Sequence, residues 1–195
     1  MSIEDTKITQ LPSALPAILL DTETLGFKMA SEPQIGSLLR TLAASKPGGR
    51  LLELGTGTGV GTAWLLDGMD AAARLETVDN DEVAVVVART HLSHDPRVAL
   101  HVADGAEFLR AQAGQRFDLI FADTWSGKFT DLEMALSLLG PGGLYVIDDL
   151  LPQPSWPEGH RLKVPPLIAA LASHADLCCT RLAWASGVMV AVKRV

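Results

Sequence analysis

Residues 51–62, with the sequence LLELGTGTGVGT, join an apolar run to four alternating glycines in a chain of 195 residues. The apolar run predicts a buried strand, and the glycines predict a turn whose backbone can approach a ligand closely at the start of a helix. No glycine of this segment has further glycines two and five places after it, so the spacing disfavours a dinucleotide fingerprint. The lack of any lysine between Lys46 and Lys128 disfavours a phosphate-binding Walker loop. The segment therefore predicts a compact ligand of another kind.

Aspartates follow the next two predicted strands. Asp79 ends the first of them, where a carboxylate can accept both hydroxyl groups of a ribose, and Asn80 comes next. Asp104 stands just after the second strand, before Gly105 and Ala106. Either aspartate region could instead cap a helix, because Asp side chains accept hydrogen bonds from the first N–H groups of a helix. Together with the glycine segment, these residues predict a site for a ligand that carries a ribose.

The pattern Glu53-x-Gly55-x-Gly57-x-Gly59 resembles the first motif of class I S-adenosylmethionine-dependent methyltransferases. The resemblance implies that Glu53 lies near the amino end of the cofactor, that the glycines pass beneath it, and that Asp104 contacts the adenine amino group. It also implies a three-layer, Rossmann-like α/β sandwich. The predicted cofactor-binding residues are Glu53, Gly55, Thr56, Gly57, Gly59, Asp79, Asn80, Asp104, Gly105, Ala106 and Asp123.

Two later segments, FDLIFAD at 117–123 and PGGLYVIDD at 141–149, resemble the catechol and caffeoyl-CoA type of O-methyltransferase. The resemblance implies that Asp123, Asp148 and Asp149 bind a divalent metal, and their oxygens would suit Mg²⁺, Ca²⁺ or Mn²⁺. Such a metal would lower the pKa of a substrate hydroxyl, whose oxygen could then attack the methyl group in line. The alternative is that Asp148 and Asp149 form an acidic wall for the cationic cofactor or cap the following loop.

Two positions depart from the pattern of that family. Asp149 replaces the usual asparagine, and Ser126 stands three residues after Asp123, where the family carries its catalytic lysine. Lys128 is nearby but out of register. If no metal binds, a side-chain base is needed, and His160 is the best candidate because imidazole titrates near neutral pH. The predicted catalytic residues are therefore Asp123, Lys128 and His160, and the alternative for His160 is an exposed loop histidine.

Two tryptophans, Trp125 and Trp156, are expected beside the same crevice. They could form walls for a flat, aromatic acceptor, or they could be core residues, as Trp64 and Trp184 are expected to be. The predicted reaction is methyl transfer to a hydroxyl oxygen of a small acceptor molecule. Two alternatives stay open: a cofactor-binding module without catalysis, and a nicotinamide-dependent reductase on a related fold.

Short apolar runs alternate with helical patterns from residue 50 onward, which indicates a mainly parallel sheet with helices on both faces. Only three residues, 185–187, join the last two runs, which are too few for a crossover helix and predict an antiparallel hairpin. Seven strands are predicted, at residues 50–54, 74–79, 97–102, 117–123, 144–149, 177–184 and 188–193.

Capping patterns and helical spacing predict the helices. One helix covers residues 81–92, and another begins with a capping box from Thr130 to Glu133 and continues to Leu139, before the GPGG terminator at 140–143. A capping box from Ser31 to Gln34 begins a further helix that ends before residue 47, so residues 1–49 form a helical lead-in to a single domain. Residues 152–166, with five prolines, predict an irregular loop.

The composition excludes some classes of partner. The net charge is −7, and neither end carries a run of lysine or arginine, so nucleic acid is not expected as a partner. The apolar stretch 11–20 is broken by two prolines and has no basic segment before it, which is typical neither of a signal peptide nor of a membrane span. A cytoplasmic protein without membrane association is therefore expected. Residues 11–25 suggest, as a hypothesis, an N-terminal arm of a homodimer.

Overall fold

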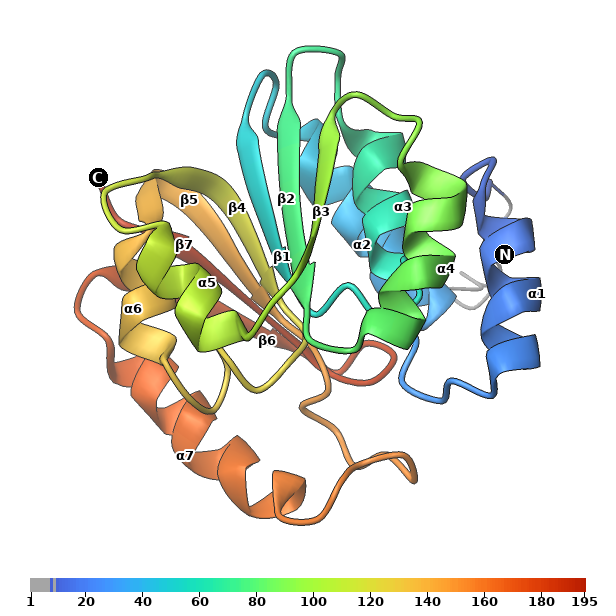
Figure 1. Ribbon diagram of the computed structural model, residues 1–195. Helices are drawn as coiled ribbons and strands as arrows, with labels where there is room; N and C mark the ends of the chain where they lie inside the picture. Colours follow the sequence, from blue (N-terminus) through green and yellow to red (C-terminus); the bar gives the residue numbers. More distant parts are fainter. Residues whose placement is uncertain (1–7, 9) are drawn as a thin grey trace, which may run out of the picture.

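A seven-stranded sheet with the order β3-β2-β1-β4-β5-β7-β6 runs through the structure (Figure 1). The computed structural model describes residue 8 and residues 10–195. Strands β1 to β5 pair in parallel, whereas β7 pairs antiparallel with both β5 and β6. The predicted sheet and its C-terminal hairpin are confirmed. The strands are β1 (Arg50–Leu54), β2 (Arg74–Asp79), β3 (Val98–Val102), β4 (Phe117–Ala122), β5 (Leu139–Ile147), β6 (Leu177–Leu182) and β7 (Val188–Lys193).

Helices cover both faces of the sheet, because successive residues of a buried strand point to opposite sides. Leu51 and Leu119 belong to one core cluster with residues of α2, α3 and α4, and α1 packs on the outside of α3 and α4. Leu52 and Ile120 belong to the other cluster, with residues of α5, α6 and α7. Figure 1 shows these two groups of helices on the two sides of the sheet. The helices are α1 (Leu15–Leu25), α2 (Pro33–Ala44), α3 (Val60–Gly68), α4 (Glu82–Leu92), α5 (Gly105–Ala111), α6 (Leu132–Ser137) and α7 (His160–Ser173).

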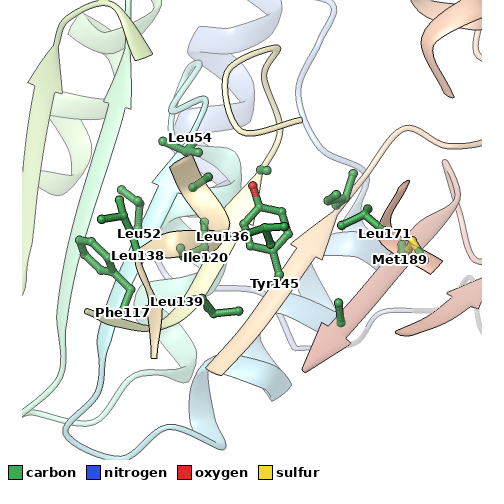
Figure 2. Packing of buried hydrophobic residues seen from close by; sticks show 14 of the residues in the cluster. Leu52, Leu54, Phe117, Ile120, Leu136, Leu138, Leu139, Tyr145, Leu171 and Met189 are labelled. Carbon is green, nitrogen blue, oxygen red and sulfur yellow. The ribbon is translucent and has the colours of Figure 1, made fainter. Parts of the chain in front are cut away.

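Tyr145 of β5 connects the core beneath α5 and α6 to a loop at the sheet edge. Its ring packs in one cluster with Leu52 and Ile120, and Figure 2 shows these three side chains within the cluster. Burial raises the pKa of Tyr145 well above its usual range, so the hydroxyl stays protonated and donates a hydrogen bond to the carbonyl of Gly127. The core therefore fixes the loop that carries Lys128.

The predicted capping box from Thr130 to Glu133 is wrong. The N-cap of α6 is Asp131, which is left-handed with φ 57° and makes no side-chain capping bond, and Thr130 Oγ1 donates to the carbonyl of Trp125 at 3.3 Å. The helix ends at Ser137, and Leu139 already belongs to β5, so residues 140–143 form an irregularity in the strand. Apolar spacing cannot distinguish a last helical turn from the start of a buried strand.

The predicted capping box from Ser31 to Gln34 is also wrong. The residue at the N-cap of α2 is Glu32, without a side-chain capping bond, and Pro33 occupies the first turn. The Ser31 hydroxyl donates instead to Asp123 Oδ2 at 3.1 Å. A tertiary partner 92 residues away has replaced the local one.

The irregular loop predicted for residues 152–166 is wrong in its second half, because α7 begins at His160 and contains Pro165 and Pro166. These prolines leave the carbonyl groups four residues earlier without helical donors. Those carbonyls belong to Arg161 and Leu162, which are exposed and can bond to water. Burial of one side of the helix then outweighs the two missing bonds.

Helix α1 uses part of the apolar segment 11–25 within the same chain. Leu15 and Ile18 are fully buried, whereas Leu20 is 64% exposed. The dimer arm stays a prediction. Within residues 8 and 10–195, none of the helices has the length and apolar character needed to cross a membrane.

Close packing of α2 on α3 leads to a first prediction. A Cβ added at Gly36 would overlap the indole ring of Trp64, which is fully buried. Gly36→Ala should lower the free energy of unfolding by about 1 to 3 kcal/mol, because the ring has no free space to move into. Urea denaturation monitored by circular dichroism measures this change. Thr41→Ala, at an exposed position of the same helix, is the matched control, and equal stability of the two variants would contradict the packing.

Candidate active site

A cavity of about 440 Å³ opens at the carboxyl ends of the central strands. Its lining comes from the turns after β1, β2, β4 and β5 and from the linker between α1 and α2. Open α/β sheets bind ligands at this edge. Predicted site residues that line the cavity are Gly55, Thr56, Gly57, Asp79, Asn80, Asp123, Trp125, Lys128, Asp148, Asp149, Trp156 and His160.

The glycine turn forms one half of the cavity. Gly55 has φ 105°, and a Cβ there would stand 2.9 Å from the carbonyl oxygen of Asp123, so only glycine lets these two backbones come so close. The amide of Gly57 donates to Asp79 Oδ2 at 2.8 Å, which ties the turn to the end of β2. Gly59 lies outside the lining, and a Cβ there would press on Ala88 of α4. It serves the packing of α3 against α4.

Asp79 holds the glycine turn and can still accept hydrogen bonds from a ligand. One oxygen accepts the Gly57 amide, and the other accepts the amide of Asp81 at 2.9 Å. Each carboxylate oxygen has a second lone pair, so the group can still accept hydroxyl donors from a ligand in the cavity. Asp81, two residues further on, takes the helix-capping role that was the alternative for this region. Its side chain accepts the amides of Val83 and Ala84 at the start of α4.

Glu53 lies beneath the glycine turn and is outside the cavity lining. Its Oε2 accepts hydrogen bonds from Thr62 Oγ1 at 2.5 Å and Thr77 Oγ1 at 2.6 Å, whereas Oε1 has no partner in the described chain. Burial raises the pKa of Glu53 to about 7. The Thr77 hydroxyl also bonds to Thr56, which does line the cavity, at 2.7 Å. Glu53 therefore supports the turn from below.

The segment from Asp104 to Ala106 also lies outside the lining. Asp104 caps α5 by accepting the amide of Glu107 at 3.0 Å, which is the alternative role considered for it. Gly105 packs against Ser126, whose Cβ would be 2.7 Å from a Cβ at this glycine. Contact with an adenine ring stays a prediction for this segment.

Two carboxylates line the cavity beside the strand ends, and of these Asp148 is buried and Asp123 is half-buried. Asp123 accepts the Ser31 hydroxyl, and burial together with the charge of Asp148 holds its pKa well above the usual range. Asp148 accepts the Ser186 hydroxyl and the amide of Asp149, and burial raises its pKa to about 6. Each carboxylate thus already has a donor of its own.

The predicted metal site does not fit this arrangement. Within the described part of the chain, no three side chains of His, Cys, Asp or Glu gather closely enough to hold a metal ion. Asp149 has a left-handed backbone, with φ 58°, which turns the chain between it and Asp148. The carboxylates of Asp123, Asp148 and Asp149 line one cavity without forming a ligand set.

Lys128 reaches the cavity despite being out of register in the sequence. The turn that carries it is closed by bonds from the amides of Lys128 and Phe129 to the carbonyl of Trp125, at 3.1 and 2.8 Å. The side chain of Lys128 is only 3% exposed, and its charge opposes the raised pKa values of Asp123 and Asp148. The tight turn therefore brings Lys128 to the cavity, and its catalytic role stays a prediction.

His160 is buried at the first position of α7, so the exposed-loop alternative is wrong. Its ring stacks on Trp156 at 4.3 Å and meets the edge of Phe129 at 4.8 Å. Nε2 lies 3.1 Å from the carbonyl oxygen of Asp149, which can only accept, so Nε2 carries hydrogen and Nδ1 keeps the lone pair. Burial lowers the pKa of His160, which keeps the ring neutral near pH 7.

The two tryptophans differ in their surroundings. Trp125 is 39% exposed, and the ammonium of Lys163 lies 5.0 Å from its ring centre. Trp156 is held by its stack on His160, and its buried Nε1 has no acceptor in the described chain. Both line the cavity, with one at its rim and one against the histidine.

Comparison with known proteins decides the family. A family model described as a methyltransferase domain matches residues 52–150, or 99 of the 195 residues. The chain belongs to this methyltransferase family. It is 30% identical over 128 residues to a catechol O-methyltransferase from Mycobacterium tuberculosis, over 64% of this chain and 58% of that protein. The match thus spans little more than half the length of this relative.

Solved structures share the fold of this methyltransferase domain. An O-methyltransferase from Bacillus cereus in complex with SAH is 21% identical, with a TM-score of 0.83 over 96% of this chain and 93% of that one. The O-methyltransferase TomG from Streptomyces achromogenes, in complex with SAM, is 23% identical, with a TM-score of 0.81 over 98% and 94%. The Rossmann-like methyltransferase fold is confirmed.

Two site residues of the methyltransferase domain were missed in the sequence. Ser31 was assigned to a capping box, and Ser186 lies in the hairpin turn, whose position was predicted but whose contact with Asp148 was not. The linker between α1 and α2, including Phe27, also lines the cavity. No local pattern signals these contacts, because each depends on an approach of distant segments.

Glu53 leads to a prediction about pH. Its folded pKa of about 7 lies above the ordinary 4.5, so its contribution to stability is full below that ordinary value and is lost as the pH rises to about 7. As the pH rises from about 5 to about 8, the free energy of unfolding should fall less for Glu53→Gln than for the parent protein, and the difference should be about 1 to 3 kcal/mol. Urea titrations across this range measure the difference. The exposed Glu133→Gln is the control, and parallel pH profiles for Glu53→Gln and the parent would refute the assignment.

Proposed function

We propose that this domain transfers a methyl group from S-adenosylmethionine to a hydroxyl oxygen of a small, aromatic acceptor. The observation that carries the proposal is the single cavity that joins the glycine turn and Asp79 to Asp123, Lys128 and His160. Membership of the methyltransferase family and the name of the mycobacterial relative support it.

The part of the cavity formed by the glycine turn and Asp79, here the cofactor half, suits a nucleoside that also carries a positive charge. The turn at Gly55 and Gly57 offers backbone surface without side chains, and Asp79 offers acceptors for ribose hydroxyls. Carboxylates at Asp123 and Asp148 give this edge of the sheet an acidic character that favours a sulfonium ion. S-adenosylmethionine supplies a methyl group on such a sulfonium.

His160 is the group that accepts the acceptor's proton. Nδ1 holds the lone pair, and the lowered pKa keeps it unprotonated at neutral pH. As the proton moves to Nδ1, the acceptor oxygen forms its bond to the methyl carbon, and the electron pair of the breaking carbon–sulfur bond returns to sulfur. The products are the methyl ether, S-adenosylhomocysteine and a protonated His160.

The aromatic side chains favour a flat acceptor. Trp156 and Phe129 hold the His160 ring in one orientation, and Trp125 presents a further ring at the rim. A planar phenol could lie against these rings with its hydroxyl toward His160 and Lys128, in a site that fixes the distance between the reacting atoms.

Cofactor binding provides a direct test. Calorimetry should detect S-adenosylmethionine binding to the parent protein, and Asp79→Asn should weaken it by about ten-fold or more, because a charged acceptor is lost from the turn and the ribose site. Asp67→Asn, which removes a surface ion pair with Arg40, is the matched control. Lack of binding by the parent protein at high micromolar cofactor would refute the proposed function.

The role of His160 predicts a kinetic effect. With a panel of mono- and dihydroxylated aromatic compounds, S-adenosylhomocysteine release should be detectable, and His160→Gln should lower kcat by about 10² to 10⁴. In the parent protein, kcat should rise with pH below the ordinary pKa range of histidine, because His160 must lose its proton before it can act as a base. This rise should be absent from His160→Gln. His174→Gln, a histidine that pairs with Glu133, is the control. An unchanged pH profile in His160→Gln would assign the base elsewhere.

A further inference from the structure

Lys128 is a buried cation whose ammonium forms no direct pair in the described chain. The residue is 3% exposed, yet it lines the cavity. No hydrogen bond or ion pair joins its Nζ to the described residues, and Nζ lies 5.4 Å from the centre of the Phe129 ring. Burying an ammonium is costly unless charges or donors nearby compensate for lost water.

The compensation comes from carboxylates across the cavity. Lys128 acts electrostatically on Asp123, on Asp148 and on His160, so its charge lies within reach of all three. Asp123 and Asp148 nevertheless bond to Ser31 and Ser186 and not to the ammonium. The space between the ammonium and the carboxylates therefore belongs to the cavity, where an acceptor oxygen can enter.

A divalent metal and this ammonium would compete for the same carboxylates. Like charges close together in a buried site disfavour each other strongly. The carboxylates do not form a ligand set for a metal, and the lysine already supplies positive charge in the same cavity. The chain thus carries a cation of its own where the sequence predicted a metal.

We propose that Lys128 is the resident cation of the acceptor half of the cavity, which is the part lined by Asp123, Asp148 and His160. Methyl transfer by this domain is then independent of divalent metals. The inference rests on the proposed function. The ammonium donates a hydrogen bond to the acceptor oxygen and stabilises the negative charge that develops on it as His160 takes the proton. Such a preorganised donor acts strongly in a site with little water.

The first test measures metal binding and needs no acceptor. Calorimetry with MgCl₂ and MnCl₂ on the cofactor-loaded protein should give no saturable binding in the millimolar range. Lys128→Met should instead bind Mn²⁺ measurably, at an affinity at least about ten-fold above the weakest that the titration detects, because the carboxylates then attract a cation without an opposing charge beside them. Lys163→Met, which removes a rim lysine, is the matched control and should behave like the parent. Stoichiometric Mn²⁺ binding by the parent, or equally weak binding by folded Lys128→Met, would overturn the inference.

The second test uses activity on the best acceptor of the panel. Chelation by EDTA should change kcat by less than about two-fold, whereas Lys128→Met should lower kcat by about 10² to 10³ with cofactor affinity retained. Retained cofactor affinity also shows that the variant is folded. Loss of activity in EDTA that Mg²⁺ restores would overturn the inference while leaving the proposed methyl transfer intact. Failure to bind cofactor would instead refute the proposed function, and the metal titration would still decide the role of Lys128.

Discussion

The close approach of the Gly55 and Asp123 backbones is the constraint on which the site depends. β1 and β4 are neighbours at the centre of the sheet, and the amide of Asp123 donates to the carbonyl of Leu54 at 2.8 Å, so the ladder extends one bond beyond the strand end. A side chain at residue 55 would strike the Asp123 carbonyl. The cofactor half and the acceptor half are therefore joined through main chain atoms, which holds their separation constant.

Charge is the second organising constraint. Glu53 and Asp148 are buried and Asp123 is half-buried at one edge of the sheet, and desolvation raises the pKa of each. Their side chains accept hydrogen bonds from hydroxyl groups of threonine and serine. Lys128 favours the ionised forms of Asp123 and Asp148, and a positively charged ligand would do the same, which connects ligand binding to the stability of the sheet edge.

The sheet could be predicted because its signals are local. Alternating strands and helices, a hairpin too short for a crossover and glycines at a strand end each reflect backbone geometry within a few residues. Strand ends differ from the predicted ones by at most two residues, except that β5 begins at Leu139 and not at residue 144. That error and the false capping box at Ser31 share a cause, because a tertiary partner replaced the local one at Ser31 and Leu139. Thr130 differs, since its hydroxyl bonds within its own loop to the carbonyl of Trp125.

Side chains that directly follow a strand, such as Asp79, Asp123 and Asp148, line the cavity as predicted, and so do Trp156 and His160 from the segment after β5. Glu53 lies beneath the turn and Asp104 caps α5, and their contacts with a cofactor stay predictions. Lys128 could not be placed by counting from Asp123, because the turn that brings it back depends on the Trp125 carbonyl and on Tyr145 beneath it. The turn thus brings Lys128 to the cavity although its position in the sequence is out of register with the family pattern.

The bond between Ser31 and Asp123 has a consequence for how the protein is made. It joins residues 92 positions apart, and Ser186, which holds Asp148, lies 38 positions after that aspartate. During synthesis the glycine turn leaves the ribosome long before β4, β5 and β7 exist to complete the cavity. Competence to hold a ligand therefore emerges only after β7 has formed, and a bound ligand would selectively retain molecules whose entire sheet has assembled.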